Sequence, residues 1–359
     1  MAYVSGHGFG HATRCAQVLR AVREEDPAAR ITVVSQAPES LFRTAIPGDL
    51  TYRSIECDVG LVQRDAVTID VRGTAKACQA FSETWEERVE AEARWLGEVG
   101  ADVVLGDVPP LAFAAAARAG VSSVALANFS WDWIYEHLSA ADPVLAEAAE
   151  QARAAYSQTG LLLRLPFAGD LSAFPRMENI PLVARRPRVG GEEGRRRLGF
   201  GGRPLVLLSF GGIGFRGPSP EALGLLGEFD FIVDAAGGRG SPSNVRVVDD
   251  ERRAALGLGY EDVVGAADVV VTKPGYGIVT DAIAGRTRMV YTERGDFPEY
   301  PILVGEMARY LPSAHVSNDD LRAGRLRAPI RAVLDQPFPD PPRLDGARVA
   351  ARRVLEIVG

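Results

Sequence analysis

The first residues that could take part in chemistry lie in one turn at positions 6–11, which reads Gly-His-Gly-Phe-Gly-His. An apolar run precedes this turn, and residues 16–22 follow it with the periodicity of an amphipathic helix. Glycine lets the backbone turn sharply and lets a ligand come close, while free N–H groups at a helix start favour anions or oxyanions. The turn predicts such a site beside His7 and His11. A tight strand-to-helix turn capped by its histidines is the alternative.

A second turn of this kind follows the apolar strand expected at 268–272, where Lys273 is followed by Gly275 and Gly277. A helix with an apolar face comes next. A lysine and open backbone amides at a helix N-terminus are suited to a diphosphate, and Asp281 is placed to accept two hydrogen bonds from a vicinal diol. A helix start with a solvent-facing lysine is the alternative interpretation.

A third turn, with Gly211, Gly212 and Gly214, ends the apolar run that begins at residue 204. It repeats the design at the start of the chain, so the two halves of the chain share one architecture. In open α/β sheets, ligands bind outside the carboxyl ends of the strands, where glycine turns bring backbone N–H groups together. Two such domains that face one another would enclose a cleft, with one glycine turn from each side.

The elements that position these turns alternate between apolar strands and helical patterns. Further strands are expected at 30–35, 101–107, 123–128, 231–235, 245–248 and 289–292. Strands separated by crossover helices predict the α/β class, with parallel sheets covered on both faces. A length of 359 residues suggests two domains of ordinary size.

We predict a first domain at 1–170, a linker at 171–203 and a second domain at 204–340. The linker assignment rests on the loss of periodicity after residue 167, where Pro, Gly and Arg become frequent. The remaining segment, 341–359, is expected to form a C-terminal helix that packs back on the first domain.

Composition narrows the function classes. A net charge of −7 and a pI near 5.4 predict no nucleic-acid or anionic-membrane partner and favour a small-molecule ligand. The three cysteines have no C-x-x-C spacing and no histidine at metal-ligand spacing, so we predict reduced thiols and no metal site. No leader pattern precedes the first strand, and the longest apolar stretch, 108–127, is interrupted by Pro-Pro, Arg and Gly. We therefore expect a cytoplasmic protein without a membrane span, and no feature specifies its oligomeric state.

Three motifs together resemble a known family: residues 6–11, the Asn-Phe-Ser-Trp-Asp-Trp-Ile-Tyr run at 128–135, and the Thr-Lys-Pro-Gly-Tyr-Gly run at 272–277. The chain resembles GT-B glycosyltransferases, which have two Rossmann-like domains, and the superfamily that includes the bacterial UDP-GlcNAc transferase of peptidoglycan synthesis. More closely, it is similar to the glycosyltransferase-like N-terminal half of plant L-arabinokinases. The kinase half of those proteins has no counterpart here, so arabinokinase activity is not implied.

The resemblance implies catalytic roles for two residues. The Gly10-His11 pair matches the position at which inverting members hold a general base, and Asp107 matches the aspartate that orients this histidine. Attack on an anomeric carbon requires a base with a pKa near neutral, and a carboxylate fixes the imidazole tautomer. Asp107 is alternatively an N-cap for the helix after it. His7 is the second candidate base, although a turn-stabilising role is favoured for it.

The resemblance also implies a donor site in the second domain. Nucleotide-diphosphate binding is expected at the two glycine turns, at Gly211, Gly212, Gly214, Lys273, Gly275, Tyr276 and Gly277. Asp281 matches an acidic residue that contacts the ribose, usually glutamate in the family. Glu299 falls where members place a residue that reads the donor sugar hydroxyls, commonly in an Asp-Gln or Gln-Gln pair.

The acceptor is expected on the first-domain side of the cleft. Aromatic rings offer a flat face to sugar C–H groups, and amide or carboxylate groups bind hydroxyls. The expected residues are His7, Gly8, Phe9, Asn128, Trp131 and Asp132. For Trp131, a place in the core is the alternative.

We therefore expect an inverting glycosyltransferase that takes a nucleotide-diphosphate sugar, with UDP or dTDP as the carrier, and uses no metal or other cofactor. The transferred sugar (hexosyl, pentosyl or N-acetylhexosaminyl) and the acceptor (a small molecule or a glycan) stay open. One alternative is a sugar-nucleotide epimerase or hydrolase in which Asp107 and Glu299 act on the sugar. Another is a non-catalytic nucleotide-sugar sensor or partner subunit.

Overall fold

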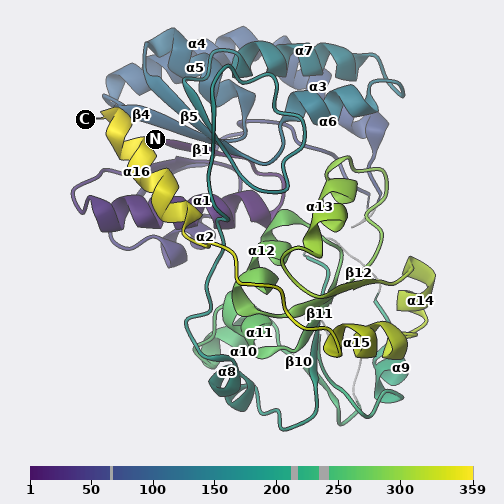
Figure 1. The fold of residues 1–359 in the computed structure, drawn as a ribbon. Helices are drawn as coiled ribbons and strands as arrows, with labels where there is room; N and C mark the ends of the chain where they lie inside the picture. Colours follow the sequence, from purple (N-terminus) through teal and green to yellow (C-terminus); the bar gives the residue numbers. More distant parts are fainter. Residues whose placement is uncertain (65–67, 212–216, 234–241, 359) are drawn as a thin grey trace.

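Two parallel sheets form the centres of two α/β domains, one above the other in Figure 1. The computed structural model describes residues 1–64, 68–211, 217–233 and 242–358. The first sheet has the strand order β3-β2-β1-β4-β5-β6-β7, with β1 at Ala2–Val4, β2 at Thr32–Val34, β3 at Thr51–Arg53, β4 at Val103–Asp107, β5 at Ser122–Ala127, β6 at Leu161–Arg164 and β7 at Met177–Asn179. The second has the order β10-β9-β8-β11-β12-β13, with β8 at Leu205–Ser209, β9 at Asp230–Val233, β10 at Val245–Val247, β11 at Val269–Thr272, β12 at Arg288–Tyr291 and β13 at Ser313–His315. The predicted α/β class with two Rossmann-like domains is confirmed.

Helices cover both faces of each sheet. Those of the first domain are α1 (Phe9–Glu25), α2 (Glu39–Ala45), α3 (Val71–Glu83), α4 (Trp85–Glu98), α5 (Pro110–Ala119), α6 (Trp131–Leu138) and α7 (Val144–Tyr156). The second half of the chain adds α8 (Gly191–Arg197), α9 (Pro220–Gly224), α10 (Asp250–Ala255), α11 (Tyr260–Ala266), α12 (Tyr276–Gly285), α13 (Glu299–Met307), α14 (Asn318–Arg322), α15 (Arg327–Leu334) and α16 (Gly346–Val358).

The core explains why these apolar runs form strands. In β1, Ala2 and Val4 belong to one apolar cluster while Tyr3 belongs to another, and all three are fully buried. Successive side chains of a strand point to opposite faces, so a strand with helices on both sides is apolar at every position. The first of these clusters continues into the second domain, where it includes Val270 of β11. The two domains are thus joined by apolar packing as well as by the chain.

The central pair of strands in each sheet positions the predicted turns. The strand order reverses direction between β1 and β4, which pair so that Val4 lies opposite Asp107, and again between β8 and β11, where Ser209 lies opposite Thr272. Connections leave such a pair toward opposite sides and leave a crevice at the carboxyl ends of the strands. All three glycine-rich turns identified in the sequence therefore begin at this edge.

The chain crosses between the domains twice, and the two crossings touch. The backbone N–H of Gly346 donates to the carbonyl oxygen of Leu182 at 3.2 Å, and a β-carbon on Gly346 would collide with the carbonyl of Pro181. After the second crossing, α16 packs along α1 of the first domain (Figure 1). Strand β7 of the first sheet lies beyond residue 170, within the segment predicted as a linker.

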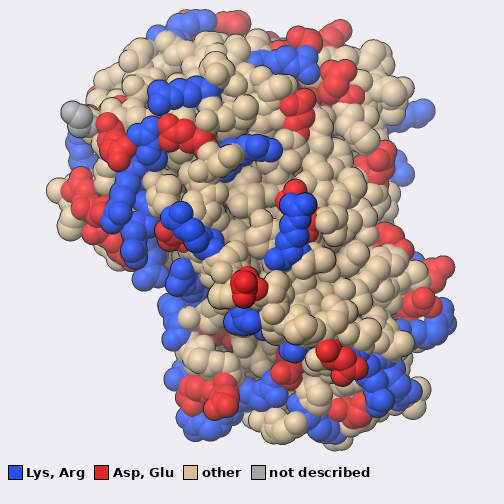
Figure 2. All heavy atoms as spheres, viewed as in Figure 1, with Lys and Arg blue, Asp and Glu red and all other residues tan. Residues whose placement is uncertain are grey.

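On the face seen in Figure 2, acidic and basic side chains are mixed over both domains. Many of them form ion pairs, such as that of Arg118 with Glu86 at 3.3 Å. Among the described residues, no helix combines the length and apolar character needed to cross a membrane.

Candidate active site

His11 and Asp107 meet at the carboxyl edge of the first sheet. Asp107 is the last residue of β4, and His11 lies in the first turn of α1, which begins after Gly8 with its positive φ of 79°. The Nδ1 atom of His11 lies 2.8 Å from Oδ1 of the fully buried Asp107. Because a carboxylate only accepts, His11 donates its Nδ1–H to Asp107, and in a neutral imidazole Nε2 then carries the lone pair. This is the protonation pattern that a general base requires.

Arg14, which the sequence analysis did not identify, holds Asp107 from the other side. Its Nε donates to Oδ2 at 2.8 Å and its Nη2 donates to Oδ1 at 2.6 Å. Burial opposes ionisation of the carboxyl group, but the charge and hydrogen bonds of Arg14, together with those of His11, outweigh burial and hold the pKa of Asp107 below its ordinary value. The sequence signal was the spacing: Arg14 lies three residues after His11, on the same face of α1.

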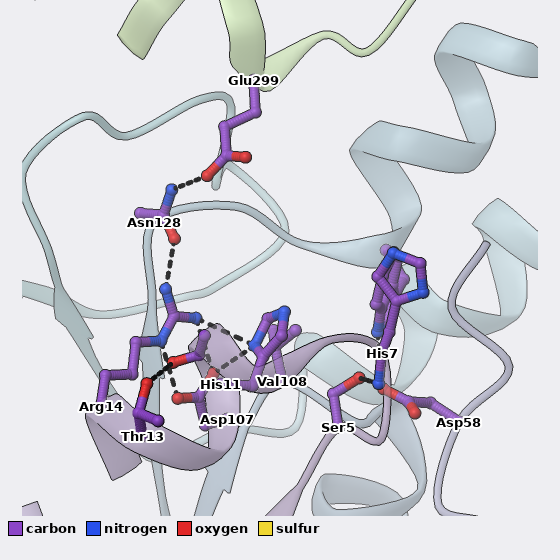
Figure 3. Close-up of polar contacts among 12 residues, drawn as sticks. Ser5, His7, His11, Thr13, Arg14, Asp58, Asp107, Val108, Asn128 and Glu299 are labelled. Carbon is purple, nitrogen blue, oxygen red and sulfur yellow. Dashed lines mark hydrogen bonds and ion pairs between the residues drawn. The ribbon is translucent and has the colours of Figure 1, made fainter. Parts of the chain in front are cut away.

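The same arginine begins a connection to the second domain, shown in Figure 3. Arg14 Nη1 donates to Oδ1 of Asn128 at 2.6 Å, and Nδ2 of Asn128 donates to Oε1 of Glu299 at 2.7 Å. Asn128 follows β5, whereas Glu299 begins α13 in the second domain, and both are buried. A continuous series of hydrogen bonds thus joins the two domains, from Asp107 through Arg14 and Asn128 to Glu299.

In the second domain, Glu299 is bound by Arg294, a residue that no motif in the sequence indicated. Its Nη1 donates to Oε2 of Glu299 at 2.6 Å and to the carbonyl oxygen of Pro274 at 3.4 Å. The same atom lies 3.7 Å from the place of a β-carbon on Gly275. A guanidinium therefore lies against the turn predicted to bind a diphosphate. Glu299, predicted to read sugar hydroxyls, is ion-paired here.

The starts of α1 and α12 face one another. A β-carbon on Gly277 would lie 3.5 Å from Cα of Gly10, so the two backbones approach with no side chain between them. Helix N-termini carry positive partial charge, which two converging starts concentrate. Tyr276, the first residue of α12, is buried in this interface with its ring 5.0 Å from the Arg14 guanidinium carbon. Lys273 lies at the end of β11, in the same turn.

Two other predicted donor residues lie apart from this group. Gly211 follows β8 with a positive φ of 74°, whereas Gly212 and Gly214 lie outside the described residues. Asp281 is buried in α12, and Arg185 of the first crossing binds both its carboxylate oxygens, with Nε 3.2 Å from Oδ1. The ribose contact stays a prediction, and it requires this ion pair to open.

The residues predicted for the acceptor divide into exposed and buried sets. Phe9 is 54% exposed, whereas Trp131 has no exposed surface. The indole of Trp131 donates to Oδ2 of buried Asp58 at 2.7 Å, and its ring packs against His7 with 5.4 Å between centroids. Trp131 therefore supports the opening turn from the core, as the alternative interpretation expected. Asp132 is buried as well, 3.6 Å from Arg153, and burial raises its pKa.

In the part of the chain that the structure describes, no three His, Cys, Asp or Glu side chains are grouped so that they could bind a metal ion. The cysteines at 15, 57 and 78 are free and buried.

Comparison of the whole fold defines its class. The glycotransferase of kitacinnamycin aligns over all of this chain and 94% of its own, with a TM-score of 0.62 and 18% identity. The UDP-glucose:anthocyanidin 3-O-glucosyltransferase, solved with UDP, aligns over 99% of this chain and 93% of its own, with a TM-score of 0.61 and 12% identity. The chain has the GT-B fold of glycosyltransferases.

A more specific similarity is found in sequence. L-arabinokinase from Arabidopsis thaliana is 33% identical over 328 residues, which cover 90% of this chain and 31% of that protein. The chain thus spans about a third of the length of this relative. No profile of a known protein family matches the chain.

Proposed function

We propose that the protein is an inverting glycosyltransferase in which His11 is the general base. The observation that carries this proposal is the 2.8 Å contact between His11 Nδ1 and Asp107, which leaves Nε2 free to accept a proton beside the facing start of α12. General-base catalysis of this kind contributes about 10²- to 10⁴-fold to rate.

The reaction is a single displacement. An acceptor hydroxyl gives its proton to His11 Nε2 as its oxygen bonds to the anomeric carbon, and the bond from that carbon to the diphosphate oxygen breaks. Asp107 stabilises the imidazolium that forms. A single displacement requires attack and departure on opposite faces of the anomeric carbon, so the configuration inverts, and a base and a diphosphate site on opposite domains are compatible with this geometry.

The second domain provides the cations for the departing diphosphate. The amides at the start of α12 and the side chains of Lys273 and Arg294 form a positive site where negative charge develops. We propose UDP as the carrier because three structural neighbours were solved with it, and dTDP as the second choice. With these positive groups beside the diphosphate, the proposed reaction needs no metal ion.

A binding role without transfer is the second candidate, since both carboxylates predicted to read the donor are ion-paired with arginines. Asp281 pairs with Arg185 and Glu299 pairs with Arg294. A sensor of nucleotide sugars would bind through the amides of α12 and leave these pairs closed.

The test begins with thermal shifts of the purified protein against nucleoside diphosphates and nucleotide sugars. A ligand at about 100 times its dissociation constant adds roughly 2.7 kcal/mol to stability. We expect one nucleotide sugar to stabilise the wild type and Lys273→Ala to lose that shift. Lys273→Ala is a better control than Asp281→Ala, which would leave Arg185 buried without its partner.

The transfer assay then separates the two candidates. We expect His11→Ala to keep the thermal shift with the donor and to lose transfer by about 10²- to 10⁴-fold. A His11→Ala variant with wild-type turnover would exclude the base assignment, and a protein that binds the donor but transfers to no acceptor would support the sensor. If no nucleotide sugar binds at millimolar concentration, both candidates fail.

A further inference from the structure

The backbone around His7 determines which of its ring nitrogens carries the proton. The N–H of Leu61 donates to His7 Nδ1 at 3.2 Å. A backbone N–H only donates, so Nδ1 must carry a lone pair, and a neutral imidazole then has its proton on Nε2. No hydrogen-bond partner for His7 Nε2 lies among the described residues. The His7 residue as a whole is only partly buried, and we take this N–H as a donor available to a ligand.

The position of the ring is fixed from two sides. A β-carbon on Gly60 would lie 2.7 Å from Cβ and 2.8 Å from Nδ1 of His7, so the imidazole rests on a residue that must be glycine. Gly60 also has a positive φ of 65°, and its carbonyl oxygen accepts from the Tyr135 hydroxyl at 3.1 Å. The edge-on ring of Trp131 supports the imidazole from the core. The site is therefore built to hold His7 in one orientation.

The surroundings keep this imidazole neutral. Burial lowers the pKa of His7 to about 3, and the neighbouring His11, Arg294 and Lys273 add to this effect. A ring with Nδ1 already engaged and Nε2 already protonated has no free site for another proton. His7 therefore differs from His11 in function although the two lie four residues apart, because His11 presents an Nε2 lone pair and His7 presents an Nε2–H.

From this pair of opposite tautomers we propose that His7 positions the acceptor by donating its Nε2–H to a second acceptor oxygen, while the reacting hydroxyl faces His11. The inference rests on the proposed transferase function. It identifies the acceptor as a polyol, a sugar or a glycoside, because such molecules carry further oxygens near the reacting hydroxyl. Exposed Phe9 follows His7 by two residues and offers an apolar face to the C–H groups of such a ring.

Two amide variants separate the donor role from a structural one. In His7→Asn, the side-chain oxygen takes the place of Nδ1 and keeps the contact with Leu61, but no donor remains at the Nε2 position. In His7→Gln, the amide nitrogen is as many bonds from the backbone as Nε2 and restores a donor. For a sugar or glycoside acceptor we expect the KM to rise about tenfold in His7→Asn and to return to within about threefold of wild type in His7→Gln.

The remaining kinetic parameters distinguish the outcomes. We expect kcat, the donor KM and the acid limb of the pH profile to stay close to wild type in both variants. If His7→Asn keeps the wild-type acceptor KM, the inference is overturned and His7 only stabilises the turn. If kcat falls more than a hundredfold and the acid limb disappears in both variants, His7 is a base and the inference is again wrong.

A measurement independent of turnover keeps the inference testable if the proposed function fails. Imidazole ¹⁵N resonances identify the protonated nitrogen of a histidine, and the signals absent from His7→Gln assign His7. We expect a neutral ring with a protonated Nε2 from pH 8 to pH 5. A His7 ring that titrates near pH 6.5 would overturn the inference whether or not the protein transfers a sugar.

Discussion

The starts of α1 and α12 have similar positions and backbones but carry different side chains. Each follows a central strand of its sheet, each contains glycine, and the two meet at Gly10 and Gly277. The start of α1 carries His11 and Arg14, which are both bonded to a buried carboxylate. The start of α12 offers mainly backbone, with Lys273 before it and Arg294 beside it. One helix start thus orients reactive side chains, and the other leaves backbone amides open to an anion.

The two helix starts are also expected to contribute differently to the stability of the fold. In the first domain, an Asp107 charge with no exposed surface depends on Arg14, which is itself almost fully buried. In the second domain, the turn at Lys273 and Gly275, which precedes α12, is partly exposed. Changes at α1 are therefore expected to alter stability, and changes at α12 to alter ligand binding.

The largest expected effect is that of Arg14→Met, which leaves the Asp107 carboxylate buried without its main partner. We expect the free energy of unfolding to fall by about 3–5 kcal/mol. Lys273→Met, the matched change at α12, is expected to stay within about 1 kcal/mol of wild type. Urea unfolding measures both.

A double variant sharpens this comparison. Arg14→Met combined with Asp107→Leu removes both charges, and apolar replacement of a buried pair is often neutral. We expect the double variant to recover most of the stability lost by Arg14→Met. A loss below 1 kcal/mol in Arg14→Met alone would show that the two helix starts do not differ in this way.

The next largest effect on stability is expected at Asn128, which bonds to Arg14 in the first domain and to Glu299 in the second. Asn128→Ala removes partners from both Arg14 and Glu299 and is expected to cost about 1–3 kcal/mol. Asn128→Asp keeps an acceptor for Arg14, removes the donor to Glu299 and places a second carboxylate against it, so it replaces the contact between the domains with a repulsion. If Asn128→Asp unfolds like wild type while Asn128→Ala is destabilised, the bond to Glu299 contributes nothing to the interface.

The last effect, which is the smallest one near neutral pH, is a dependence of stability on pH that belongs to the α1 side. His7 has a pKa of about 3 in the folded protein, compared with about 6.5 in an unfolded chain. Below pH 6.5 the unfolded chain binds a proton that the folded protein does not, so the free energy of unfolding falls as the pH drops from 6.5 toward 3. We expect His7→Gln to reduce this slope, by at most about 1.4 kcal/mol per pH unit. Equal slopes in the two proteins would contradict the assignment of a neutral His7.

At the acidic end of this pH range, Asp107 is expected to add a second change in the free energy of unfolding. Its folded pKa lies below the ordinary value, so its contribution is present above about pH 3.9 and is lost as the pH falls further. This component is expected in His7→Gln as well as in wild type, which makes it an internal control.

The sequence predicted what depends on local pattern. The strands, the glycine turns and the helices after them follow from periodicity and turn chemistry within a few residues, and the parallel topology places the ends of β1 and β4 together. That topology, with the family resemblance, placed His11 near Asp107, which lies 96 positions further along the chain. Strand β7 was not expected because it is only three residues long and has no apolar pattern.

What depends on contacts across the molecule was not predicted. Arg14 meets Asp107 and Asn128 only when the first domain folds, and Asn128 meets Glu299 only when the two domains are docked, because no local pattern fixes which polar groups meet. Asp281 pairs with Arg185 of the crossing segment for the same reason. For Trp131, sequence alone left a cleft and a core position open, and its complete burial favours the core.

The contact between the two crossings has a mechanical consequence. Because the outgoing chain at Pro181 and Leu182 touches the returning chain at Gly346, both tethers of the second domain converge on one spot. A swing about that spot stretches neither tether, so it behaves as a hinge with a single pivot. We expect rotation about that spot to change the separation of the helix starts that face each other at Gly10 and Gly277.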